Sequence, residues 1–173
     1  MKLLDRVKAV LLDPEFERKR EFLQRIPLFR GIPRRQFGSL FRALAVRNYH
    51  AGEVLFSEGD IGRALFILER GKVALTRKAS AGKDRPLAVL EPGAYFGEMA
   101  LLEERPRTAT ATAREEARAH LLYKTELDKI LRGSPEIGAA VMTHLAQLLS
   151  ARLRDALERP PQTPRPAPAG EAE

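Results

Sequence analysis

The sequence has no cysteine and only three histidines. Without cysteine, no disulfide framework supports the fold, which fits a reducing cytoplasm. His50, His120 and His144 lie far apart in the sequence, and none has the spacing of a metal-ligand pair. We therefore expect no metal cofactor.

Long apolar runs and catalytic motifs are also missing. No stretch approaches the ~20 apolar residues that a membrane-spanning helix needs. Near the N-terminus, Asp5, Arg6 and Lys8 interrupt the apolar positions, so this segment is not a signal peptide. The sequence shows no Ser/His/Asp grouping and no phosphate-binding loop ending in Gly-Lys-Ser/Thr. We expect a cytoplasmic protein that does not act at a membrane and is not an enzyme.

The composition that is present is that of a basic globular protein. The 173 residues are 44% hydrophobic and 31% charged, which suits one soluble domain with appendages. The formal net charge of +7 has two interpretations. The basic residues form either a surface that binds nucleic acid or anionic lipid, or a solvated surface in which a few cations serve an anionic ligand. Because the basic residues are scattered and no recognition helix is visible, we favour the second.

Two stretches before residue 46 have helical periodicity. Apolar residues recur at helical spacing over residues 2–24 and again over 33–45. Asp13-Pro14-Glu15 has the chemistry of a cap with proline in the first turn. We therefore expect the first stretch to divide into two helices.

From Val46 to Tyr123 the pattern changes to that of strands. Short runs rich in Val, Leu, Phe and Thr are separated by turns that contain glycine. The runs cover residues 54–57, 64–69, 72–78, 87–90, 107–113 and 116–123. Turn signals at this spacing are typical of a β-sandwich or barrel.

A helical pattern returns after Tyr123. A short helix is expected over 126–132, and Ser134-Pro135-Glu136 has the signature of a capped start for a longer one that extends to about Glu158. The apolar stripe of this second helix consists of Ile137, Val141, Leu145, Leu148, Leu149 and Leu153.

These patterns divide the chain into three parts. We expect an N-terminal helical segment over 1–25, one domain over 26–158 and a disordered tail over 159–173. The tail holds five of the twelve prolines and no large apolar residue, so it has nothing to bury. It is either a solvated tail, which we favour, or a proline-rich docking segment.

One run, residues 96–110, combines the groups that hold a small phosphorylated sugar. Gly97 lets the backbone approach a ligand without a Cβ in the way. A short helix starting near it would point free N–H groups at an anion. Arg107 presents a permanently charged planar fork that matches a phosphate. The Glu98 carboxylate can accept a hydrogen bond from a neighbouring hydroxyl of the ligand. Alternatively, Glu98 caps the short helix.

This run resembles the phosphate-binding cassette of the cyclic nucleotide-binding domain family, of the type found in catabolite activators and kinase regulatory subunits. The family pattern is roughly Phe-Gly-Glu, four mainly apolar residues, a short loop and Pro-Arg-x-Ala-Thr. The residues at matching positions are Phe96, Gly97, Glu98, Ala100, Leu101, Pro106, Arg107, Ala109 and Thr110. Gly52-Glu53-Val54 followed by Glu58-Gly59-Asp60 resembles a hairpin of the family's β-roll, and the resemblance covers about residues 26–157.

The resemblance implies an α+β fold, in which an antiparallel, jelly-roll-like β-roll is flanked by N-terminal helices and a C-terminal lid helix. It also implies a regulatory ligand, cAMP or cGMP, and a receptor that changes conformation on binding it. Arg107 would hold the phosphate and Glu98 the ribose 2′-hydroxyl. A hydroxyl at Thr108 permits contact with guanine in this family, although Thr108 also suits an ordinary strand. We take cAMP as the first choice and keep cGMP beside it.

The expected ligand site combines the cassette with a wall and a lid. Arg152 would stack over the base, unless it faces solvent. The expected ligand-binding residues are Phe96, Gly97, Glu98, Met99, Ala100, Arg107, Thr108 and Ala109 in the cassette, Leu75 and Val89 in the wall, and Leu148 and Arg152 in the lid.

Other functions fit less of the sequence than a receptor does. A cupin-like enzyme needs clustered histidines, which are missing. A transcription factor of this family needs a DNA-binding domain, and the fifteen residues after Glu158 are too few, so we expect no direct DNA binding. A degenerate β-roll that interacts with a partner but binds no nucleotide stays open. The sequence does not name the downstream protein, and the helix over 134–158 is compatible with a homodimer.

Overall fold

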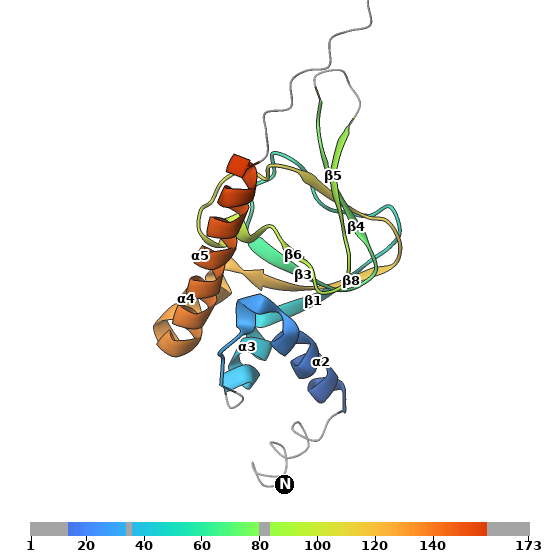
Figure 1. The fold of residues 1–173 in the computed structure, drawn as a ribbon. Helices are drawn as coiled ribbons and strands as arrows, with labels where there is room; N and C mark the ends of the chain where they lie inside the picture. The colour runs from blue at the N-terminus through green and yellow to red at the C-terminus, as the bar shows by residue number, and fades with distance from the viewer. Residues whose placement is uncertain (1–13, 34–35, 80–83, 159–173) are drawn as a thin grey trace, which may run out of the picture.

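The computed structural model describes residues 14–33, 36–79 and 84–158, and Figure 1 shows its fold. The helix expected within 2–13 and the tail 159–173 lie outside the described residues. Where the chain is described, it has no helix with the length and hydropathy to span a bilayer.

The described strands form two antiparallel four-stranded sheets. The first sheet has the order β1 (Leu44–Tyr49), β8 (Ala117–Tyr123), β3 (Ala64–Arg70) and β6 (Tyr95–Phe96). The second sheet has the order β2 (Val54–Phe56), β7 (Thr110–Ala113), β4 (Val73–Arg77) and β5 (Arg85–Leu90). The predicted antiparallel β-roll within an α+β fold is confirmed.

The two central strands of the first sheet, β8 and β3, are buried on both faces, because they lie between the second sheet and the helices. On β3, Phe66 and Leu68 pack into the cluster between the sheets. The alternate residues Leu65 and Ile67 pack against the helices. Successive side chains of a strand point to opposite faces, so a strand covered on both sides is apolar throughout. This is why the sequence from Leu65 to Leu68 has no polar position.

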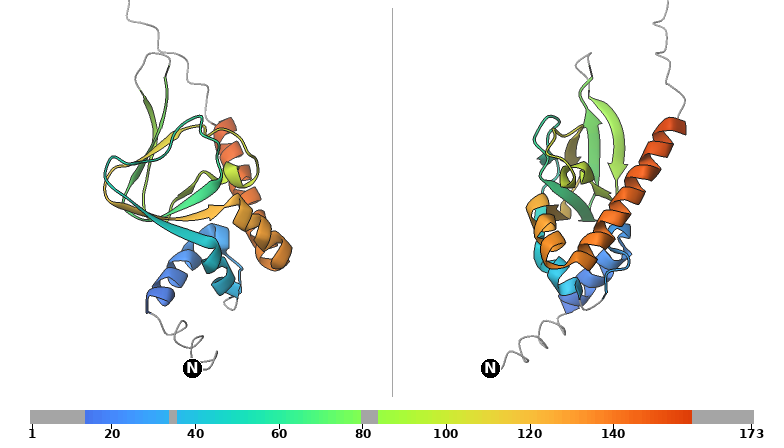
Figure 2. Two further views of the ribbon diagram at one scale, coloured as in Figure 1. Left: turned by 180° about the vertical axis from the view of Figure 1, so that it is seen from behind. Right: turned by 90° about the vertical axis from the view of Figure 1, so that its left-hand side faces the viewer.

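The helices gather on the outer face of the first sheet (Figure 2). They are α2 (Pro14–Arg25), the 3-10 helix η1 (Pro27–Phe29), α3 (Phe37–Ala43), α4 (Lys124–Gly133) and α5 (Pro135–Glu158). Their shared core with the sheet includes Leu23, Phe29, Leu40, Leu127 and Val141, each at most 1% exposed. The other 3-10 helix, η3 (Glu98–Leu101), interrupts the path from β6 to β7.

The structure corrects the sequence analysis at two strand boundaries. The helix expected over 33–45 ends at Ala43, and β1, which was not predicted, begins at Leu44. The central residues of β1, 45–48, are all exposed, so the strand carries no apolar alternation. The run expected over 107–113 is a strand only from Thr110, because residues 108–109 form a bend.

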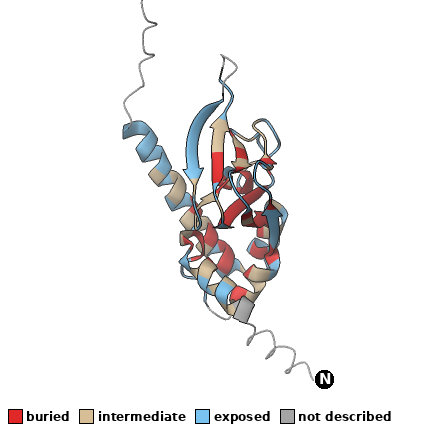
Figure 3. Cartoon of the chain, turned by 90° about the vertical axis from the view of Figure 1, so that its right-hand side faces the viewer, coloured by how far each residue is buried: buried red, intermediate tan, exposed pale blue. Residues whose placement is uncertain are grey.

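The apolar packing of the long helix α5 is tightest along its first half. Ile137, Val141 and Leu145 are fully buried, as their place in the predicted stripe requires. The stripe does not continue to its predicted end, because Leu153 is 61% exposed. Figure 3 shows the last turns of α5 as exposed, like β5 across from them. The end of α5 therefore extends beyond the helical core.

Beneath α2, one histidine of the first sheet is buried. His120 on β8 is 1% exposed, and its ring stacks on Phe22 with centroids 5.8 Å apart. Its Nε2 lies 2.9 Å from Glu69 Oε2. Burial lowers the pKa of His120, and the Glu69 carboxylate opposes part of that effect. Thus α2 covers a polar pair as well as apolar side chains.

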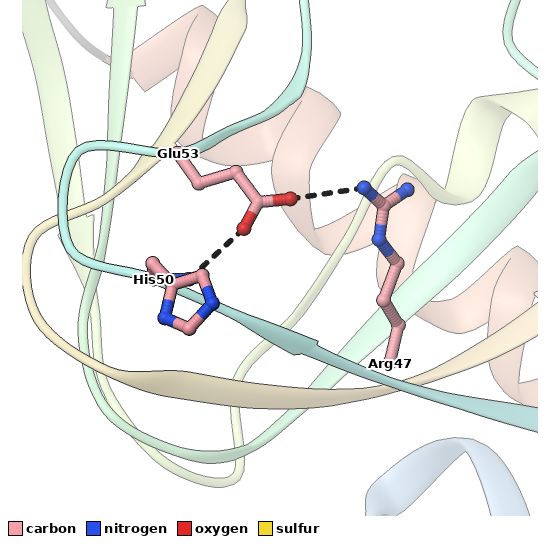
Figure 4. A network of polar contacts seen from close by, with 3 residues as sticks. All are labelled: Arg47, His50 and Glu53. Atoms are coloured by element: carbon pink, nitrogen blue, oxygen red, sulfur yellow. Dashed lines mark hydrogen bonds and ion pairs between the residues drawn. The ribbon is translucent and has the colours of Figure 1, made fainter.

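The turn from β1 into β2 is held by Glu53, as Figure 4 shows. Its carboxylate accepts hydrogen bonds from Arg47 Nη2 at 2.9 Å and from the His50 backbone N–H at 2.9 Å. The His50 backbone hydrogen bond, followed by Arg47, lowers the pKa of Glu53. This surface network fixes the start of the strand that leads to the candidate site.

Candidate functional site

A cavity of about 740 Å³ opens between the second sheet, η3 and the end of α5. Its apolar walls come from both sheets, and its polar groups come from the run 96–110 and from α5. It is lined by Phe56, Gly62, Leu75, Ala88, Leu90, Phe96, Gly97, Glu98, Met99, Ala100, Glu103, Arg105, Pro106, Arg107, Thr108, Ala109 and Arg152. A cavity of this size with a few convergent polar groups is typical of a small-molecule site.

The structure brings together most of the residues that the sequence singled out. All eight cassette residues, together with Leu75 and Arg152, line the cavity. Val89 does not, because it is 54% exposed and its neighbours Ala88 and Leu90 lie along the wall. Leu148 does not line it either, since it packs against the helical core one turn before Arg152.

Gly97 makes the sharp turn that starts the cassette. Its φ of 72° and ψ of 22° are left-handed, a conformation that glycine adopts without strain. It directly precedes η3, whose first N–H groups, on Glu98 and Met99, have no partner within the helix. A Cβ added to Gly97 would lie 2.4 Å from Arg107 Nη1. Glycine is therefore required here for both conformation and space.

Arg107 is fixed by hydrogen bonds to main-chain oxygens. Its Nη1 donates to the Gly97 carbonyl at 3.0 Å and its Nη2 to the Ala64 carbonyl at 2.7 Å. The guanidinium carbon lies 4.2 Å from the centroid of the Phe56 ring. The backbone N–H of Arg107 donates to the Asp60 carbonyl at 2.7 Å, which ties its loop to the turn after β2.

The charge of Arg107 is poorly compensated by the protein. Burial lowers the pKa of Arg107, while Glu98 and Asp60 act in the opposite direction. Within the described ranges Arg107 forms no ion pair, and Glu98 pairs with Arg152 instead. An arginine does not lose its proton in a protein. This half-buried cation at a cavity wall is therefore suited to an anionic ligand.

Glu98 is a buried carboxylate at the base of the cavity. It is 3% exposed, and it accepts a short hydrogen bond from Arg152 Nη1 of α5. Arg152 itself is half-exposed, with 49% of its side chain open to solvent. The pair joins the last turns of α5 to the cassette. Among the described residues, Arg152 on an exposed helix end is the one hydrogen-bond partner of this buried carboxylate, so Glu98 can exchange that partner for a ligand hydroxyl.

Sequence reasoning missed several lining residues, for two different reasons. Glu103 and Arg105 lie inside the run already singled out, but neither was assigned a role. Phe56 comes from β2 and Gly62 from the segment after it, 51 and 45 residues before Arg107 in the sequence. A Cβ at Gly62 would lie 3.3 Å from the Arg107 guanidinium carbon, and only the fold shows that approach.

Metal chemistry has no obvious place among the described residues, since no three His, Asp or Glu side chains there gather as a metal-ion site would need. The polar side chains that line the cavity are the carboxylates of Glu98 and Glu103, the hydroxyl of Thr108 and the guanidinium groups of Arg105, Arg107 and Arg152. Together they can recognise an anion beside a hydroxyl group.

The chain is similar in sequence to a known domain family and to two proteins that contain this domain. The sequence profile of the cyclic nucleotide-binding domain matches residues 46–134, which is half of the chain. The "Cyclic AMP receptor protein" of Thermus thermophilus is 38% identical over 130 residues, which cover 75% of this chain and 58% of that protein. The "cAMP-dependent protein kinase regulatory subunit" of Neurospora crassa is 32% identical over 133 residues, covering 74% of this chain and 34% of that one.

A solved structure with a similar fold is nearly the same length as the matched region. The N-terminal domain of a transcriptional regulator from Streptomyces coelicolor superposes with a TM-score of 0.71 at 33% identity. The match covers 82% of this chain and 98% of that domain. By contrast, the chain spans 58% of the length of the first bacterial curated relatives.

Replacing Gly97 tests the geometry of the cassette. We expect Gly97→Ala to lower the free energy of unfolding by more than Gly93→Ala does. Both glycines have a positive φ, so each alanine adds about 1–2 kcal/mol of backbone strain. Only at Gly97 does the new Cβ also displace Arg107, because nothing lies within 4 Å of a Cβ at Gly93. Urea unfolding curves of both variants measure the difference, and equal losses would contradict this geometry.

Proposed function

The chain belongs to the cyclic nucleotide-binding domain family, and on that premise we propose that it is a receptor module that holds cAMP in the cavity beside Arg107. The observation that supports this most directly is the half-buried guanidinium at the cavity wall, which has no ion pair among the described residues. A cyclic phosphate carries one negative charge and presents two oxygens to such a fork. The proposed chemistry is recognition, without catalysis.

Each part of the ligand has a matching part of the cavity. The phosphate would lie between Arg107 and the first N–H groups of η3. The ribose 2′-hydroxyl would donate to Glu98, the buried carboxylate beside them. The purine would lie against the apolar wall of the second sheet, formed by Leu75 and Leu90.

The choice between adenine and guanine depends on the relatives of this chain and on Thr108. The relatives named above are a cyclic AMP receptor protein and a cAMP-dependent kinase subunit, which favours cAMP for this chain. Thr108 lines the cavity, so its hydroxyl is available to a guanine amino group. One neutral hydrogen bond changes affinity by roughly two- to tenfold. We therefore propose cAMP as the main ligand, with cGMP accepted.

Calorimetric titration with cAMP and cGMP tests the proposed ligand. Wild-type protein should bind cAMP, and Arg107→Ala should bind it about ten- to a hundredfold more weakly, because a charge-assisted pair is worth roughly 1.5–3 kcal/mol. Arg107→Lys should fall between them, since it keeps the charge but loses the fork. Arg114→Ala is the matched control, because it removes one exposed positive charge from a turn outside the cavity.

The opposite outcome is also informative. Absence of heat and of any thermal shift with either nucleotide at millimolar concentration would overturn the receptor proposal. That result would favour the alternative function, in which the protein is a β-roll interaction module that no longer binds nucleotide.

We further propose that ligand binding is signalled through α5. Arg152 on its exposed end is joined to the cavity by Glu98. A ribose hydroxyl that takes over Glu98 competes with Arg152, so the ligand and the helix end share one buried carboxylate. A ligand shifts a conformational equilibrium only through such a difference in contacts between the two states.

Hydrogen exchange of the last turns of α5 tests this coupling. We expect cAMP to change the exchange of residues 150–158 in the wild-type protein. The analogue 2′-deoxy-cAMP should change it much less, since it has no hydroxyl for Glu98. In Arg152→Ala these amides should exchange rapidly with or without ligand. Identical effects of cAMP and 2′-deoxy-cAMP would exclude competition for Glu98 as the signal.

A homodimer through α5 is a second proposal, and it rests on exposed apolar side chains. Leu149, Leu153 and Leu157 are four residues apart and therefore share one side of the helix. Leu153 and Leu157 are 61% and 75% exposed. A stripe of this kind on a helix that leaves the core is suited to pairing with a second copy.

Sedimentation analysis tests the dimer. The wild-type protein should sediment at twice its 19.4 kDa chain mass, and the Leu153→Glu/Leu157→Glu variant should sediment as a monomer. Gln147→Glu, which adds a charge at another exposed position of α5, should leave the dimer intact. A wild-type monomer at all concentrations, with and without cAMP, would exclude this interface.

A further inference from the structure

We propose that Phe56 is a positioning residue for Arg107, whose ring holds the guanidinium in the orientation that receives the ligand phosphate. The inference rests on the proposed function, because it concerns the same site. It assigns a role to a residue that lies outside the 96–110 run and comes from a different sheet from β6, where that run starts.

The contact itself is a stack of a cation on a ring. The Arg107 guanidinium carbon lies 4.2 Å from the Phe56 centroid and 5.6 Å from that of Phe66. The Phe56 ring is in turn packed on Phe66 and Phe96, with centroids 5.3 and 6.1 Å away. The ring that carries the cation is therefore itself held by two buried rings. A cation over an aromatic face is favoured, and more strongly when water is excluded.

A β-bulge turns Phe56 toward Arg107. Val54 pairs with Thr112 and Phe56 with Ala111, so β2 has one residue more than β7 across this interval. Strict alternation would place Phe56 on the outer face with Val54, which is 46% exposed. Instead Leu55 and Phe56 both pack into the cluster between the sheets. Bulges often re-aim a side chain beside a functional site.

The Phe56 ring restrains the tilt of the Arg107 guanidinium, which its two hydrogen bonds do not fix. The two carbonyls that accept from Arg107 define two edges of the guanidinium plane. A ring whose centroid lies 4.2 Å from the guanidinium carbon limits how far the guanidinium can tilt, and so limits the directions of its remaining N–H groups. Gly62 leaves room beside the Arg107 guanidinium carbon and Nε, where a Cβ would lie 3.3 Å from each. Phosphate recognition by a planar fork depends on such orientation.

The competing explanation is that Phe56 is only part of the apolar wall. A double-mutant cycle with cAMP separates the two roles. We expect Phe56→Leu to weaken cAMP binding roughly three- to tenfold when Arg107 is present. In the Arg107→Gln background the same substitution should have almost no effect. Phe56→Tyr, which keeps the ring, should restore affinity to within about twofold of wild type.

Leu90→Ala is the matched control, since Leu90 lines the apolar wall from β5, whereas the rings beneath Arg107 belong to Phe56 and Phe66. It should weaken cAMP binding by the same factor in both backgrounds. If Phe56→Leu behaves like this control, Phe56 is a wall residue and the proposal is wrong. If Phe56→Leu does not fold, Phe56→Met serves in its place, because methionine fills a similar volume without a ring.

A second measurement needs no ligand. A ring beneath Arg107 shifts the NMR signals of its side-chain protons upfield, and this shift should persist in Phe56→Tyr and disappear in Phe56→Leu. Unshifted signals in the wild-type protein would overturn the proposal. If the wild-type protein binds no cyclic nucleotide, the proposed function fails, whereas this NMR result still decides whether Phe56 holds Arg107.

Discussion

The site depends on the positive charge of Arg107, which is partly buried and is not paired with a carboxylate of any described residue. Arg107 is held by the carbonyl oxygens of Gly97 and Ala64, and its guanidinium lies over Phe56. These contacts orient the cation but neutralise it only partly, because carbonyl oxygens and ring faces carry partial charge. Glu98 lies in the same cavity and pairs with Arg152. The cavity is therefore prepared for one anion, and a cyclic phosphate satisfies that requirement in our account.

The fold provides this arrangement by bringing distant segments to one place. The first sheet contributes Ala64 and Phe96, and the second contributes Phe56 and Leu75. The left-handed Gly97 lets η3 start directly beside the guanidinium. Because the central strands β8 and β3 of the first sheet are buried on both faces, they form a rigid support. In our proposal, the part that moves is the end of α5, which has exposed apolar residues and joins the site through Arg152.

The sequence predicts those parts of the site that are contiguous. The cassette from Phe96 to Ala109 lies within one short run, so its chemistry is visible without a structure. Residues that approach from elsewhere are not visible in this way. Phe56 reaches Arg107 only because of a bulge, and strand propensity does not reveal a bulge. The sequence predicts the strand β5 but not which of its side chains point into the cavity. Val89 was therefore predicted to line the wall, which Ala88 and Leu90 line instead. Similarly, β1 escaped prediction because its middle, residues 45–48, is exposed and shows no alternation of apolar and polar residues.

A crystal structure of the protein grown with cAMP tests the central claim most directly. We expect a phosphate oxygen of cAMP within hydrogen-bonding distance of the Arg107 guanidinium, and the ribose 2′-hydroxyl donating a hydrogen bond to the Glu98 carboxylate. A nucleotide bound elsewhere would contradict it. So would a nucleotide in the cavity whose phosphate makes no contact with Arg107.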